Sequence, residues 1–100
     1  MSWASPYVDR LLRGETVKFR PTGHSMAGRI ESGQLVTVEP VTDLAAIGVG
    51  DIVLCRVGGA TYLHLVKAIR PGPRFQIGNN RGHINGWTAR IFGRCIAVEP

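Results

Sequence analysis

The chain has 100 residues, 44% of them hydrophobic, a length that allows one domain with a single core and excludes a second. Its formal net charge is +5, but the basic residues are scattered and no nucleic-acid-binding motif accompanies them. We therefore expect a solvated basic surface and no nucleic-acid partner.

The distribution of apolar residues and of glycines narrows the class of protein further. No uncharged stretch reaches the roughly 20 residues of a membrane span, and the first residues lack the basic start and apolar run of a secretory signal. We expect a soluble, cytoplasmic protein without a membrane anchor. Thirteen glycines and six prolines are spread along the chain, which is typical of many short strands joined by tight turns.

The first predicted element is a short helix over residues 5–14. Ser5 can accept a hydrogen bond from a free amide at its start, Pro6 suits the first turn, and Gly14 suits the left-handed exit. Its apolar face comprises Val8, Leu11 and Leu12. A helix this short depends on packing, so we expect it to cover one end of a sheet.

Strand patterns follow from Thr16 onward. The predicted strands cover residues 17–20, 35–39, 51–57, 60–69, 74–77 and 91–98. Gly58-Gly59 predicts a two-residue hairpin turn, residues 44–47 predict a helical turn, and residues 78–86 predict a polar loop. The whole is predicted to be one mainly β domain, with residues 1–15 as a helical segment packed on residues 16–100.

The cysteines and histidines do not form a metal-binding pattern. Cys55 and Cys95 lie in apolar strand-like runs without the close spacing of zinc or redox pairs, so we expect buried thiols, which neighbouring strands would accommodate. His24, His64 and His83 lack the helical or hairpin spacing of metal ligands. We predict neither a metal nor a cofactor.

A serine and a histidine are candidates for nucleophilic catalysis. Ser25 directly follows a proline- and glycine-containing turn, and a serine hydroxyl needs a nearby base before it can attack. Alternation along a strand places His64 and Lys67 on opposite faces, so only one of them can face Ser25. The residue types alone leave both bases open.

Four segments resemble the conserved boxes of the superfamily that joins type I signal peptidases to autoproteolytic repressors of the LexA type. Residues 23–33, Gly-His-Ser-Met-Ala-Gly-Arg-Ile-Glu-Ser-Gly, resemble its nucleophile box, Gly-x-Ser-Met-x-Pro-x-Ile-x-x-Gly-Asp. Residues 50–54 resemble its second box, residues 78–80 its Gly-Asp-Asn box, and residues 91–98 its closing strand. The resemblance implies a coiled β-sheet or partly open barrel with a short N-terminal helix.

The resemblance also implies roles for individual residues. Ser25 is the nucleophile, and His64 stands at the base position, as in the archaeal and endoplasmic-reticulum signal peptidases, with Lys67 as the alternative base. The oxyanion and loop positions are Gly23, His24 and Met26. The residues that could orient the histidine, where those enzymes use an aspartate, are Asn79, Asn80 and Asn85. Gly28 and Gln34 also differ from the family pattern, and Gly28 is expected to loosen the loop.

Three functions are compatible with these features. The first is a serine peptidase that hydrolyses an extended peptide or precursor protein, since only a helix and one strand precede Ser25 and self-cleavage would release no DNA-binding domain. The second is a catalytically inactive relative that binds peptides or a protein through the same groove. The third and least favoured is a basic nucleic-acid accessory protein.

Overall fold

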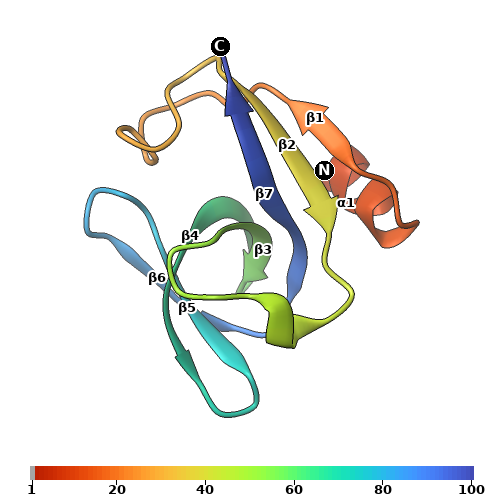
Figure 1. Ribbon diagram of the computed structural model, residues 1–100. Coiled ribbons are helices and arrows are strands. Elements are labelled where there is room, and N and C mark those ends of the chain that lie inside the picture. Colours follow the sequence, from red (N-terminus) through yellow and green to blue (C-terminus); the bar gives the residue numbers. More distant parts are fainter. Residues whose placement is uncertain (1) are drawn as a thin grey trace.

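The computed structural model describes residues 2–100 and has one antiparallel sheet with a helix at its side (Figure 1). Its elements are α1 (Ser5–Leu12), β1 (Val17–Phe19), β2 (Leu35–Pro40), η1 (Leu44–Ala46), β3 (Ile52–Val57), β4 (Ala60–Arg70), β5 (Arg74–Gly78), β6 (Ile84–Thr88) and β7 (Ile91–Glu99). The strand order is β1-β2-β7-β3-β4-β5-β6. The predicted mainly β class and the helical turn at η1 are confirmed. No helix within residues 2–100 is long and apolar enough to cross a membrane.

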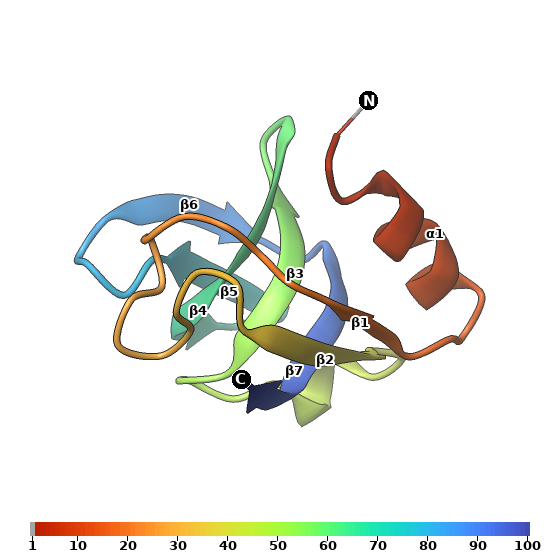
Figure 2. The ribbon, with the colours of Figure 1, turned by 90° about the horizontal axis from the view of Figure 1, so that it is seen from above.

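The sheet coils without closing, so that β6 returns toward β3 (Figures 1 and 2). Thr88 Oγ1 donates to the Arg56 carbonyl over 2.6 Å, and the Arg56 amide donates to the Arg90 carbonyl over 3.0 Å. Register shifts in four strand pairs accompany the coiling, because an extra residue on one strand bends it and increases its twist. The coil brings parts of β4 and β6 close to each other.

Alternation along the strands divides the core into two clusters. Leu54 and Leu65 belong to the cluster beneath α1, whereas Val53 and Val66, their neighbours on the same two strands, belong to the cluster inside the coil. The predicted burial is confirmed for Cys55, which lies inside the coil, but Cys95 is only half-buried and packs against the α1 cluster. They lie on the neighbouring strands β3 and β7, and both are free thiols.

Helix α1 ends at Leu12, two residues before the predicted end at Gly14, and its start also differs from the prediction. Ser5 is the first helical residue rather than the cap, and the N-cap Ala4 donates its amide to Ser2 Oγ over 3.0 Å. Val8 and Leu11 are buried as expected, but Leu12 is 70% exposed. The helix is therefore held by a narrower apolar stripe than its sequence suggested.

Strand β6 was predicted as part of a polar loop, and this prediction was wrong. Residues 84–88 pair with β5 through their backbones, although their sequence contains Asn85 and Gly86, which have low strand propensity. As an edge strand, β6 buries little apart from Thr88. Its hydrophobic pattern was too weak to signal a strand.

The contact between α1 and the sheet depends on Gly93 of β7, and we predict that Gly93→Ala is destabilising. A Cβ there would lie 2.5 Å from Val38 Cγ1, 2.8 Å from the Glu39 carbonyl oxygen and 3.0 Å from Leu11 Cδ1. Overpacking of this kind costs about 1–3 kcal/mol of unfolding free energy, measurable by urea denaturation. Gly59→Ala is the control, because a Cβ there meets nothing within 4 Å. Equal stabilities of the two variants would contradict this close packing.

Candidate active site

Ser25 lies in the connection between β1 and β2, in a turn that is anchored to the core by the buried side chain of its neighbour Met26. Met26 and Ile30 are buried, whereas Ser25 is exposed. The Ala27 amide donates to the His24 carbonyl over 3.1 Å, and the Ile30 amide donates to the Met26 carbonyl over 2.8 Å. Anchoring one residue after the serine therefore leaves the Ser25 hydroxyl at the surface of an ordered turn.

Gly28 fits this turn in a way that proline, the residue at this place in the nucleophile box that the segment resembles, could not. Its φ is +93°, whereas the proline ring fixes φ near −65°. The Gly28 amide donates to Glu31 Oε1 over 2.9 Å, a bond that proline cannot make. The expected loosening of the loop is thus offset by local hydrogen bonds.

Asn80 ties the serine turn to the connection between β5 and β6. Its backbone amide donates to the Ser25 carbonyl over 2.9 Å, and its side-chain Nδ2 donates to the Ala27 carbonyl over 2.8 Å. These bonds join segments more than 50 residues apart in the chain. The position of the Ser25 backbone relative to the coil is set by this residue.

His64 of β4 faces Ser25 from the sheet. Its side chain is buried, with 7% of the residue exposed, and its register partner is Val53 of β3. The Nε2 atom lies 3.3 Å from Ser25 Oγ. The imidazole stacks on the Tyr62 ring, with centroids 5.0 Å apart and planes inclined by 23°. The ring plane is fixed from one side by this stacking.

Asn85 fixes the other side of the imidazole. Gly78 pairs with Ile84 and Ile77 pairs with Gly86, so Asn85 is the extra residue of a bulge in β6. Its Oδ1 lies 2.7 Å from His64 Nδ1. Because a carbonyl oxygen can only accept, Nδ1 carries the proton and Nε2 presents its lone pair to Ser25. This is the tautomer that a general base for Ser25 requires.

The environment of His64 favours its neutral form. Burial is the main cause, and it lowers the pKa of His64 below the usual value of 6.5. The charge of His83 also lowers this pKa, whereas the hydrogen bond to Asn85 raises it. The neutral imidazole is therefore the main form at neutral pH. A hydrogen bond from the Ser25 hydroxyl to Nε2 is then possible in the resting protein.

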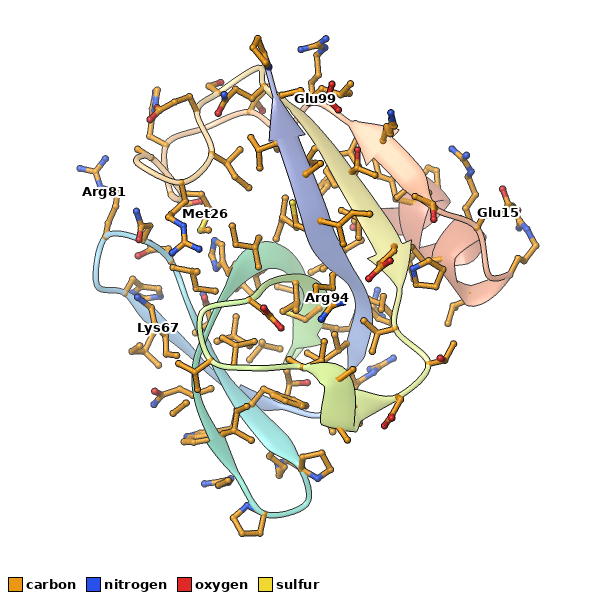
Figure 3. All side chains as sticks on the ribbon, in the orientation of Figure 1. Glu15, Met26, Lys67, Arg81, Arg94 and Glu99 are labelled. Carbon is orange, nitrogen blue, oxygen red and sulfur yellow. The ribbon has the colours of Figure 1, made fainter. Side chains whose placement is uncertain are left out.

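Lys67, the alternative base, lies elsewhere. Alternation holds through Val66, but Lys67 is an extra residue in β4, since Val66 pairs with Ile77 and Ala68 pairs with Gln76. Its Cε is 3.1 Å from the point that a Cβ on Gly78 would occupy, beside the β5–β6 connection (Figure 3). In residues 2–100, Lys67 makes no hydrogen bond with the candidate serine or histidine.

The remaining predicted residues have separate contacts. Asn79 Oδ1 accepts from the amides of Arg81 and His83, over 2.8 and 3.0 Å, and so closes its own turn. The Gly23 amide donates to Ser32 Oγ over 3.3 Å, and His24 is exposed. Of the three predicted asparagines, only Asn85 contacts the imidazole. Within residues 2–100, no cluster of three or more His, Cys, Asp or Glu side chains could hold a metal ion.

A cavity of about 200 Å³ opens in front of the serine and the histidine. Its lining comprises Trp3, Thr22, Ser25, Thr61, Tyr62, Leu63 and His64. The alternation of β4 could have indicated Tyr62, which lies on the His64 face. Nothing in the sequence indicated Trp3, because it precedes α1 and reaches the site only through helix packing. Both residues were missed in the sequence analysis.

The thiols do not compete with Ser25 for the role of nucleophile. Burial raises the pKa of Cys55 to about 12, and burial also raises the pKa of Cys95. A thiol attacks as its thiolate, which neither cysteine forms at neutral pH. Neither cysteine lines the cavity at Ser25.

Comparison with known proteins gives no family assignment: no protein-family model matches the chain, and no curated protein matches it at a significant level. The chemistry open to the site follows from its geometry. An exposed hydroxyl, a neutral imidazole and an amide oxygen stand in series. Such a series can move a proton from the hydroxyl to the ring while the amide keeps the ring in place.

Proposed function

We propose that the protein is a serine peptidase that hydrolyses a peptide bond in another chain, with Ser25 as nucleophile and His64 as general base. The observation that supports this most strongly is the series Ser25–His64–Asn85, with separations of 3.3 and 2.7 Å. The resemblance of the boxes around these residues to the signal peptidase and LexA-type superfamily points to the same reaction. A cytoplasmic location, expected from the sequence, is part of this proposal.

The reaction starts with the neutral imidazole. His64 Nε2 takes the proton of the Ser25 hydroxyl as Oγ bonds to the substrate carbonyl carbon, and the carbonyl oxygen becomes negative. The imidazolium then gives the proton to the amide nitrogen as the carbon–nitrogen bond breaks, which leaves an acyl ester on Ser25. A water molecule, deprotonated by His64, attacks the ester carbon. The imidazolium then returns the proton to Ser25 Oγ as the acyl bond breaks, which releases the acid and restores both side chains.

Two backbone amides can stabilise the negative oxygen. The amides of Ser25 and Met26 make no hydrogen bond to an acceptor within residues 2–100, whereas the Gly23 amide is engaged by Ser32. We assign the oxyanion contacts to Ser25 and Met26, because free donors at the nucleophile stabilise charge as it forms. Gly23 and His24 keep structural roles in the turn.

The lack of charge on Asn85 bears on the rate of the proposed reaction and on the alternative of an inactive relative. An amide stabilises an imidazolium less than a carboxylate does, so the proton transfer from Ser25 is less favourable than in a site with aspartate. We therefore expect slow turnover. A catalytically inactive relative that binds peptides at the same cavity is the second candidate.

Cleavage of a defined peptide mixture tests the proposal. The wild-type protein is incubated with synthetic peptides at pH 7.5, and new termini are identified by mass spectrometry. We expect cleavage products that are absent with Ser25→Ala and with His64→Ala. Products that persist with Ser25→Ala would contradict the proposed nucleophile, and peptide binding without any cleavage would favour the inactive relative.

A further inference from the structure

Three aromatic side chains gather between α1 and β1. The Tyr7 and Phe19 rings stack, with centroids 4.4 Å apart and planes inclined by 21°. Trp3 lies across both, with centroid distances of 6.4 Å to Tyr7 and 5.8 Å to Phe19. Trp3 is 52% exposed, so a large part of its surface remains free to contact another molecule.

These rings line a cavity of about 320 Å³ together with Arg20, Pro21 and Thr22. Trp3 and Thr22 also line the cavity in front of Ser25, so the two cavities adjoin. Figure 2 shows the segment before α1 beside the tip of the β3–β4 hairpin, which supplies Thr61 to the second cavity. The aromatic cavity thus adjoins the proposed active site, with Trp3 and Thr22 in the lining of both.

We propose that this aromatic cavity is a specificity subsite that takes a large aromatic side chain of the substrate peptide, an inference that rests on the proposed function. Its volume of about 320 Å³ equals that of about eleven water molecules at roughly 30 Å³ each, enough for such a side chain. Aromatic walls favour an aromatic occupant through stacked or edge-to-face contacts. Aromatic rings in the wall, and a boundary shared with the cavity in front of the nucleophile, are features of a side-chain pocket in a peptide site.

The positive charge of Arg20 disfavours a basic side chain of the substrate as the occupant of the aromatic cavity. Arg20 lines the aromatic cavity, and its Nη1 donates to the Gly33 carbonyl over 2.8 Å, which holds the guanidinium in place. Among residues 2–100, no Asp or Glu belongs to the lining of either cavity. A lysine or arginine of the substrate would therefore meet a like charge without a counter-ion.

The segment from Thr22 to Ser25 limits how far the aromatic cavity can lie from the bond that is cleaved. Thr22, which lines both cavities, precedes Ser25 by three residues. Three extended residues span at most about 10 Å, and a substrate strand advances about 3.3 Å per residue. The aromatic side chain of the substrate should therefore lie within about three residues of the bond that Ser25 attacks.

A binding experiment with the Ser25→Ala protein tests the subsite without requiring hydrolysis. A phenylalanine is moved through each position of an alanine- and serine-based octapeptide, and each Kd is measured by titration. We expect at least one position to bind about tenfold tighter than the parent peptide, since a buried aromatic anchor commonly dominates an interface. Lysine at that position should remove the gain.

Variants of the protein test whether the cavity lined by Trp3 is the one that binds the phenylalanine. Adding Trp3→Ala should bring the ratio of the two Kd values close to one. The control is Trp87→Ala, the same change at a ring that stacks under Arg70 at 4.2 Å and lines neither cavity. A gain that survives Trp3→Ala, or no gain at any peptide position, would overturn the subsite. Neither result bears on peptide cleavage by the wild-type protein and its loss with Ser25→Ala, which test the peptidase proposal separately.

Discussion

A fluorophosphonate should label wild-type protein at Ser25 and leave the Ser25→Ala variant unlabelled. The reagent needs an activated hydroxyl, and Ser25 is exposed with its Oγ 3.3 Å from a neutral imidazole. His64→Ala should lower the second-order labelling rate by about 10²–10⁴-fold, the usual contribution of a general base. Intact mass and peptide mapping measure the rate and the modified residue.

Lys67→Ala serves as the matched control for the base. Lys67 lies beside the β5–β6 connection, so its removal should leave the labelling rate near that of the wild type. Loss of labelling in Lys67→Ala with retention in His64→Ala would assign the base to lysine and contradict the geometry. All variants should be compared at equal folded fraction by circular dichroism.

Changes at Asn85 should have the second largest effect, because this side chain alone fixes the tautomer of His64. Asn85→Leu leaves the Nδ1 proton without its acceptor, and we expect the labelling rate to fall at least about tenfold. Asn85→Asp places a carboxylate there, which should raise the pKa of His64 above its wild-type value. The labelling rate at high pH should then increase, because a carboxylate stabilises the imidazolium better than an amide does.

Asn79→Asp is the control for the added charge. Asn79 Oδ1 accepts from backbone amides of its own turn, and a carboxylate can accept the same bonds. NMR titration of the His64 ring protons should therefore show a larger pKa increase in Asn85→Asp than in Asn79→Asp. Equal increases would mean that Asn85 does not contact the imidazole directly.

The sequence predicted the core of the candidate site because strand alternation and box order depend on local patterns. Alternation showed that only one of His64 and Lys67 could face Ser25, and the order of the resembling boxes selected His64, which is the arrangement in the structure. The sheet was also predictable wherever a strand carries a hydrophobic run, as in β3. These features need no knowledge of how distant segments pack.

The rest could not be predicted because it depends on bulges and long-range packing. Asn85 was one of three candidates, and a bulge in a strand mistaken for a loop selects it. Trp3 reaches the cavity only because α1 packs across β7 at Gly93, a close approach that leaves no trace in hydrophobic periodicity. The exposed Leu12 shows the same limit, since an apolar residue at helical spacing need not face the sheet.

The most direct measurement is the pH dependence of Ser25 labelling in the wild-type protein, compared with the NMR titration of His64. Only neutral His64 can accept the serine proton, so the rate should fall as pH drops through the folded pKa of His64. Burial lowers that pKa, so we predict a midpoint below 6.5, a plateau above it, and the same midpoint in the NMR titration. A rate that keeps rising above about pH 8, or one that ignores the titration of His64, would contradict His64 as the base for Ser25.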